Sequence, residues 1–365
     1  MKTSHKTTMA HRLLFPLATL YALCVVPFWL LVHDRLPPLF DAAWHGHEML
    51  FGFALAVIAG FLGTHTTRAL TATLVSTWII ARVAAALGSG VPAFLAGLAF
   101  PVTVFIATVP ALLAGSKRPE NRILPLLLTL LVAADAAWWT GRTWFGDQAH
   151  SSALLGAIDL IALLLLMMGG RTLRAALGNH LEQQGIARRD HCARNLELPL
   201  ALLATAAALT DALALSATAG LCCLGAALLA LLRVLPWQLR HALARPHLWT
   251  LALGYLWLVP GLALKGIAQL GGGPAVTDLL HGIGIGALGT LTLVMMARTT
   301  AVRARRPVTA FADIGVAAVL VSTAACCRLL AAYWPQTGDM LLWLAAGTWS
   351  GAFLILFIRL WRMAV

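Results

Sequence analysis

Long apolar stretches separated by short polar segments run through the whole chain. A transmembrane helix needs about 20 mostly apolar residues to cross ~30 Å of hydrocarbon. Clusters of Lys and Arg, together with Pro and Gly, mark the breaks between such stretches. The pattern predicts twelve spans, at residues 13–33, 44–66, 69–88, 91–114, 122–141, 151–173, 195–213, 215–233, 247–267, 277–298, 308–330 and 340–361. We therefore predict an all-α polytopic membrane protein with a single integral membrane domain over residues 1–365 and no separate soluble domain.

Composition supports this class of protein. Of the 365 residues, 60% are hydrophobic and 11% are charged, whereas soluble domains carry about 25% charged residues. This excludes a water-soluble enzyme. A net charge of +12 would by itself suit a nucleic-acid partner, but the basic residues stand in short clusters between apolar runs, as in membrane proteins. The expected partner is therefore the lipid bilayer and not a nucleic acid.

The basic clusters also predict how the chain crosses the membrane. With the N and C termini both in the cytoplasm, most Lys and Arg residues fall on the cytoplasmic side, as the positive-inside rule requires. The exceptions are Arg35, Arg142, Lys265 and Arg328 on the outer side and Arg82 within the third span. The longest connection, at about 174–194, is predicted to form a short surface helix and a turn.

Several ionisable side chains fall inside predicted spans. A charge at the centre of a membrane helix costs ~2.5–3.5 kcal/mol on insertion scales, so it needs a partner or a function. Arg82, Asp135 and Asp159 lie in the outer halves of their spans. They either line a polar cavity open to the outside or form structural ion pairs, such as Arg82 with Asp135 or Asp159. Three more, near the outer ends of spans, are expected to be solvated: Asp211, Lys265 and Asp278.

Three of the twelve histidines stand at the outer starts of predicted spans. His45 and His47 begin the second span in WHGHEMLFGF, and His281 begins the tenth in LLHGIGIGALG. Neutral imidazole is a usual ligand of haem iron and of copper. Glu48 could accept a hydrogen bond from an imidazole and so fix its tautomer. The pattern predicts that His45, His47 and His281 bind a metal centre, provided that these two spans meet near the outer face.

Small residues recur every four positions in the same two spans. Gly52, Ala56 and Gly60 do so in the second span, and Gly282 and Gly286 in the tenth. Small residues at this spacing let membrane helices approach closely. We favour this interpretation over the alternative, a flat face for a macrocycle.

The same two segments resemble the NnrS family of bacterial membrane proteins. WHGHEMLFGFALAVIAGFLGT and LLHGIGIGALGTLTLVMMAR carry the resemblance, together with AIDLIALLLLMMGGR and HLWTLALGYLWL. The resemblance implies twelve transmembrane helices in the bacterial inner membrane, haem b and copper as cofactors, and a role in nitric-oxide metabolism or resistance to nitrosative stress, often beside denitrification. Two groups of residues match the family's motifs and buried charges: His45, His47, Glu48 and His281, and Arg82 and Asp159.

The chain departs from the family pattern at Ala252 and Arg303, where family members commonly have histidines. If those histidines are ligands, the cofactor complement here is reduced. The resemblance thus leads us to expect a haem- and copper-binding membrane protein that binds nitric oxide or a related small ligand. Two alternatives stay open. One is a membrane redox enzyme that reduces nitric oxide with quinol electrons, and the other is a secondary transporter with an outward-facing polar cavity.

Overall fold

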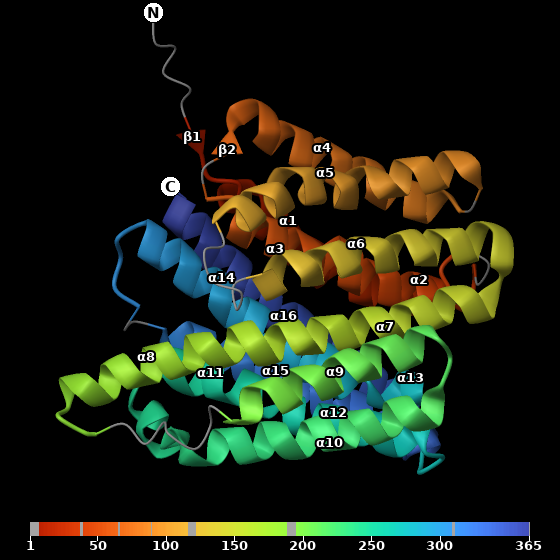
Figure 1. Cartoon of the computed structure of the whole chain (residues 1–365). Helices are drawn as coiled ribbons and strands as arrows, with labels where there is room; N and C mark the ends of the chain where they lie inside the picture. The colour runs from red at the N-terminus through yellow and green to blue at the C-terminus, as the bar shows by residue number, and fades with distance from the viewer. Residues whose placement is uncertain are drawn as a thin grey trace, which may run out of the picture. The chain divides into compact units, whose positions relative to one another are not determined.

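The computed structural model describes residues 7–36, 39–64, 66–88, 90–115, 122–187, 195–308 and 311–364. Helices make up nearly all of these residues (Figure 1). The strands found among them are two residues long each, β1 (Thr7–Thr8) and β2 (Thr66–Thr67), and they pair antiparallel. The prediction of an all-α fold is confirmed.

Eleven helices within the described residues are long and apolar enough to cross a membrane, which confirms a polytopic membrane protein. They are His11–Val32, Ala42–Leu62, Arg68–Leu87, Val91–Gly115, Ile123–Phe145, Asp147–Gln183, Ser216–Trp237, Pro246–Gln269, Val276–Arg303, Ala312–Ala331 and Gly338–Met363. The predicted span at 195–213 corresponds to α9 (Glu197–Ala212), which has 16 residues. At 1.5 Å per residue α9 is about 24 Å long, less than the ~30 Å of a hydrocarbon core. The described residues therefore contain one long span fewer than the twelve predicted.

Residue contacts divide the chain into two compact units. Unit 1 consists of residues 1–157 and 357–365 and contains α1 (His11–Val32). Its second span is one continuous helix with a π-helical middle, formed by α2 (Ala42–His47), η1 (Glu48–Ala54) and α3 (Leu55–Leu62). Four further elements follow: α4 (Arg68–Leu87), α5 (Val91–Gly115), α6 (Ile123–Thr140) and the π-helical η3 (Gly141–Phe145). Within this unit α1 packs on α3, α4 on α5, and α5 on α6.

Unit 2 runs from Ile158 to Leu356. It takes in the second part of α7 (Asp147–Leu164), which continues through the π-helical η4 (Leu165–Gly169) into α8 (Gly170–Gln183). After α9 come α10 (Ser216–Val234), η6 (Leu235–Trp237), η7 (Leu239–Ala244), α11 (Pro246–Leu256), α12 (Leu258–Gln269), α13 (Val276–Leu279), the π-helical η8 (Gly282–Gly289), α14 (Thr290–Arg303), α15 (Ala312–Ala331), η9 (Pro335–Thr337) and α16 (Gly338–Ala364). Here α10 packs on α9 and α12, α11 on α14, and η8 on α12 and α15.

The helix predicted within 174–194 is the end of α8. One side of it is buried, through Leu173, Leu177 and Leu181, so it is not simply a surface helix. Residues 188–194, with several of the basic residues used to orient the chain, lie outside the described residues. The cytoplasmic placement of the termini stays a prediction.

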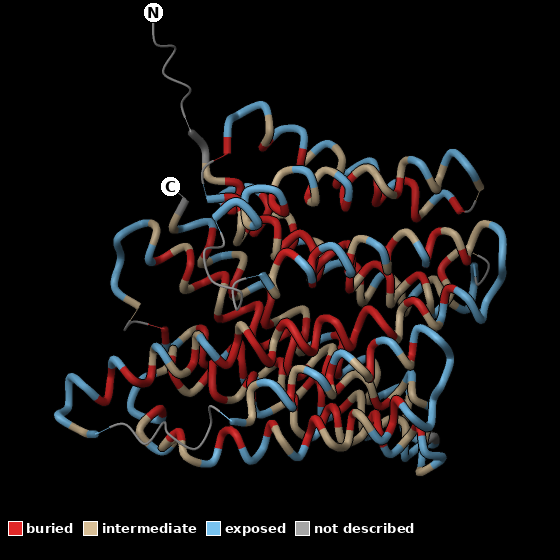
Figure 2. The backbone as a smooth tube through the Cα atoms, in the orientation of Figure 1, coloured by how far each residue is buried: buried red, intermediate tan, exposed pale blue. Residues whose placement is uncertain are grey.

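The glycines of the tenth span allow close helix contacts. A Cβ on Gly282 would lie 2.9 Å from the Cα of Gly261, and one on Gly286 would lie 2.5 Å from the ring of Trp257. Neither approach is possible for a larger residue, so protein atoms fill the space beside both glycines, as the packing interpretation expects. Buried residues run through the interior of the helices in Figure 2, and most of η8 and α14 is buried. By contrast, α1, α5 and α16 expose many large apolar side chains, as helices facing lipid do.

Candidate functional site

The histidines of the second span lie at the start of a capped helix. The backbone N–H of Trp44 donates to Asp41 Oδ1 at 2.6 Å, which satisfies one of the donors left unpaired at a helix start. Arg142 Nη1 binds Asp41 Oδ2 at 3.1 Å. The cap fixes where α2 begins, and with it the positions of His45 and His47.

His45 lies against an aromatic stack. Its ring centroid is 4.5 Å from that of Trp29, with 25° between the planes, and the ring of His33 stacks on the same indole at 4.6 Å. Trp29 Nε1 donates to the carbonyl of Phe40 at 3.0 Å, which holds the indole in place. The imidazole of His45 is therefore oriented by stacking on a fixed indole.

His47 is fully buried in a polar network. Its Nδ1 is 2.9 Å from Glu48 Oε1 and its Nε2 is 2.8 Å from Asp135 Oδ1. Arg82 Nη1 donates to Glu48 Oε1 at 2.5 Å, and the hydroxyl of Tyr21 donates to Glu48 Oε2. The network joins α1, α2, η1, α4 and α6. Arg82 thus pairs with Glu48 and not with the predicted Asp135 or Asp159.

This geometry bears on His47 as a predicted metal ligand. A carboxylate accepts hydrogen bonds, so a ring held between two carboxylates donates from both nitrogens. Neither nitrogen then offers a lone pair to a metal. A metal at His47 would have to displace Glu48 or Asp135 from the ring.

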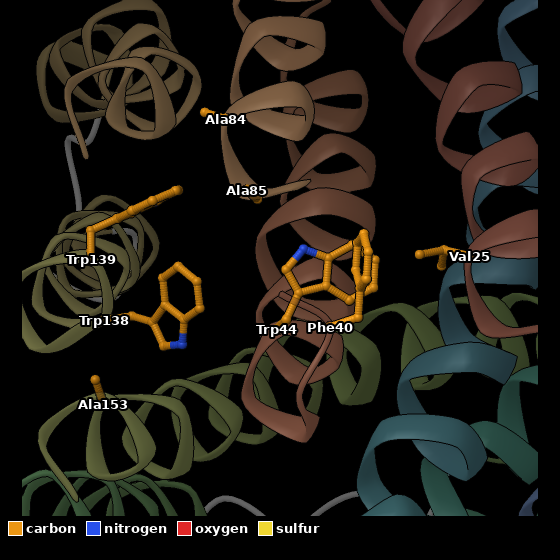
Figure 3. Close-up of a cluster of buried hydrophobic side chains, with 8 residues drawn as sticks. All are labelled: Val25, Phe40, Trp44, Ala84, Ala85, Trp138, Trp139 and Ala153. Atoms are coloured by element: carbon orange, nitrogen blue, oxygen red, sulfur yellow. The ribbon is translucent and has the colours of Figure 1, made fainter. Parts of the chain in front are cut away.

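Tryptophans surround the same imidazole. The ring of His47 stacks on Trp138 with centroids 3.8 Å apart and meets Trp139 edge-on at 5.6 Å. Both tryptophans project from α6 towards Trp44, in a buried cluster that also contains Phe40 and Val25 (Figure 3). The polar network of unit 1 therefore lies beside an aromatic core.

Several polar atoms beside His47 are buried without a hydrogen-bond partner among the described residues. They are Asp135 Oδ2, Trp138 Nε1, Trp139 Nε1 and His150 Nδ1. Buried polar groups in native proteins nearly always have a partner, which is often an ordered water or a ligand. The described residues therefore leave four polar atoms without a partner in the part of unit 1 that contains the aromatic cluster.

His281 lies between α13 and the π-helical η8. Its Nδ1 is 3.0 Å from the backbone carbonyl of Asp278. A carbonyl only accepts, so Nδ1 carries the proton, and in the neutral ring Nε2 is the nitrogen with the lone pair. Metal-binding histidines commonly show this arrangement, because it fixes the tautomer and the ring orientation. The side chain of Asp278 is half-buried and accepts from Arg328 Nη2 at 2.7 Å.

A second charged cluster lies in unit 2, and sequence reasoning missed it. Asp211 and Lys265 were expected to be solvated, but both are fully buried, so that expectation is wrong. Lys265 Nζ lies 2.7 Å from Asp159 Oδ1 and 2.5 Å from Asp211 Oδ2. The side chains pair with each other instead of with water, because unit 2 packs α10 between α9 and α12. The sequence did contain one indication of this pairing, because Asp211 and Lys265 carry opposite charges and were predicted to lie at similar depth in the membrane.

Arg233 was also missed, since its position suggested a helix end near the cytoplasm. It is fully buried at the end of α10. Its Nη2 donates to both oxygens of Glu197 at 2.8 Å, and its Nη1 donates to the hydroxyl of Tyr255 and to the carbonyl of Leu166, also at 2.8 Å. This cluster ties η4, α9, α10 and α11 together and is structural in character.

The predicted metal-site histidines belong to different units. His45 and His47 lie in unit 1 and His281 in unit 2, so their sharing of one metal stays a prediction. Within the described ranges, no group of three or more His, Cys, Asp or Glu side chains is arranged to hold a metal ion. Of the two positions that depart from the family pattern, Ala252 is buried in α11 and Arg303 is the half-buried last residue of α14.

Comparison with known proteins places the chain in a family. No curated protein matches it. The family model described as NnrS protein matches residues 7–365, which is nearly the whole chain. The chain therefore belongs to the NnrS family.

Proposed function

We propose that this protein binds haem b and copper in the bacterial inner membrane and acts in nitric-oxide metabolism or resistance to nitrosative stress. The resemblance of its two histidine-bearing segments to the family's motifs first suggested this function. The expected ligands are His45, His47 and His281.

One observation carries the proposal, namely the hydrogen bond from His281 Nδ1 to the carbonyl of Asp278 at 3.0 Å. It places the proton on Nδ1 and orients the ring, so iron or copper would bind at Nε2. His281 thus has the hydrogen bond to a backbone carbonyl that is common among metal-binding histidines. His45 fits as an oriented imidazole beside Trp29, and His47 fits only if it gives up one of its carboxylates.

The residues of the chain would hold the metal centre and control access to it. A haem iron or copper ion bound by these histidines would supply a coordination position for nitric oxide. The aromatic cluster around Trp138 and Trp139 excludes water, and its buried N–H groups can donate to a small polar ligand. Arg82 and Tyr21 hold Glu48 in place beside His47.

Metal and pigment analysis of the detergent-purified full-length protein tests the proposal. We expect a haem absorption band and bound copper in the wild-type protein, and loss of metal in His281→Ala. His241→Ala is the matched control, because His241 is also half-buried in unit 2 and its ring nitrogen accepts from Arg240. Equal metal content in the two variants would refute the role of His281.

A secondary transporter is the second candidate, and the buried ion pairs of both units favour it. Charged side chains inside the membrane commonly mark ion or substrate pathways. A folded wild-type protein that carries no metal after growth with haem and copper would support the transporter. Anaerobic consumption of nitric oxide with reduced quinol would instead make the protein a redox enzyme.

A further inference from the structure

The buried cluster of unit 2 brings together polar side chains from four helices. Asp159 comes from α7, Asp211 from α9, Cys223 from α10, and Lys265 and Gln269 from α12. Lys265 Nζ donates to Asp159 Oδ1 and Oδ2 at 2.7 and 2.8 Å and to Asp211 Oδ2 at 2.5 Å. Its distance to Cys223 Sγ is 3.6 Å. Lys265, Asp159 and Asp211 are at most 1% exposed, so water does not screen these charges.

The formal charges of the cluster do not balance. Two aspartates face one ammonium group, and among the ion pairs of the described residues Lys265 is the cation that binds either of them. With both carboxylates ionised, the cluster would carry one net negative charge inside the membrane, where unpaired charge is costly. The two carboxyl groups also share one site, because each has an oxygen within 2.8 Å of the same ammonium nitrogen. Two carboxyl groups that share a site do not both ionise readily.

Gln269 points independently to a missing donor. Its Nε2 donates to Asp211 Oδ1 at 2.5 Å, so its amide lies within the cluster. Its Oε1 is buried without a hydrogen-bond partner among the described residues, and the side chain is nine-tenths buried. One buried acceptor of the cluster is thus left without a donor. A proton on a carboxyl group adds one donor and removes the excess charge.

We infer that Asp159, Asp211 and Lys265 form an intramembrane proton-binding site in which the two carboxyl groups share one exchangeable proton. A proton fits better than a metal cation, because the ammonium of Lys265 already lies against three carboxylate oxygens and would repel a second cation. The protonated site is neutral, and loss of the proton leaves one negative charge beside the ammonium. This inference uses residues of unit 2 other than His281 and does not depend on the metal centre.

Infrared spectroscopy of the full-length protein in lipid nanodiscs tests the inference. At neutral pH we expect a carboxylic-acid C=O band from one buried aspartic acid per chain, which shifts on labelling with ¹³C-aspartate and in D₂O. Asp159→Asn and Asp211→Asn each lose this band. The control Asp339→Asn keeps it, because Asp339 is exposed at the start of α16. Lys265→Met raises the signal to two carboxylic acids, since no ammonium remains to stabilise a carboxylate.

Two results would overturn the inference. One is a folded wild-type protein without the band, a measurement that does not depend on any variant folding. The other is a thermal midpoint that rises with sodium concentration in the wild type but not in Asp159→Asn, which would identify a metal cation as the occupant. Either result would refute the proton-binding site only. The proposed function is tested separately, by the metal content of the wild-type protein and of His281→Ala.

Discussion

Replacing Arg82 with Met tests the polar network around His47. The Arg82 and Glu48 side chains are 8% and 0% exposed, and removing one partner of a buried ion pair costs about 3–5 kcal/mol. Glu48 keeps donors from Tyr21 and His47, so we expect the lower end, about 3 kcal/mol. A soluble domain of 150–250 residues loses about 2–4 °C of thermal midpoint per kcal/mol, which gives a drop of roughly 6–12 °C.

Thermal unfolding of the detergent-purified protein, followed by tryptophan fluorescence, measures the midpoint. Arg142→Met is the matched control. The side chain of Arg142 is also 8% exposed, but its partner Asp41 is 37% exposed, so water solvates the carboxylate that remains and the loss should be about 1 kcal/mol. The double variant Arg82→Met/Glu48→Gln should recover part of the loss, because it leaves no unpaired buried carboxylate. The reasoning fails if the double variant is no more stable than Arg82→Met, or if Arg142→Met costs as much.

Three further substitutions test other contacts. Gly286→Ala should destabilise by about 1–3 kcal/mol through overpacking, because its Cβ would lie 2.5 Å from a tryptophan ring; Gly115→Ala, with no atom within 4 Å, should not lower the midpoint. Tyr255→Phe should cost about 1–3 kcal/mol, since a buried donor of Arg233 loses an acceptor; an unchanged midpoint would contradict this. Asp278→Asn should leave the metal content unchanged in elemental analysis, because His281 bonds the backbone carbonyl there; loss of metal would show that the carboxylate matters.

The helices were predictable from the sequence because a membrane helix must satisfy its own backbone hydrogen bonds. Such a helix also faces hydrocarbon and so needs a long apolar stretch, and eleven of the predicted spans are long helices. The span at 195–213 was the exception. Its helix ends at Ala212, and Ala214 has a positive φ of 58°, so the apolar run continues where the helix does not. Hydropathy gives the length of an apolar stretch, but it does not show where the helix within that stretch ends.

The partners of the buried charges could not be predicted. Asp159 and Lys265 are 106 positions apart in sequence, and only the packing of separate helices brings them together. The position of Arg82 within a predicted span showed that it needed a partner. It did not show whether that partner was Glu48, Asp135 or Asp159. Lys265 and Asp211 were predicted to be solvated because each lies near the end of a predicted span. Judged together, an acidic and a basic residue at similar depth indicate an ion pair.

The two histidine-bearing segments share a local geometry that the sequence did not indicate. Directly after His47 the chain is π-helical from Glu48 to Ala54, and directly after His281 it is π-helical from Gly282 to Gly289. A π-helix has more residues per turn than an α-helix, so the side chains that follow are rotated relative to 3.6-residue periodicity. π-helical turns are frequent at functional sites, although η3 and η4 show that they also occur elsewhere in this chain. His45 and His47 themselves lie in the α-helical α2, so the π-helical turns displace the side chains that follow each histidine-bearing segment, from Glu48 and from Gly282 onward, and α-helical spacing does not place those side chains.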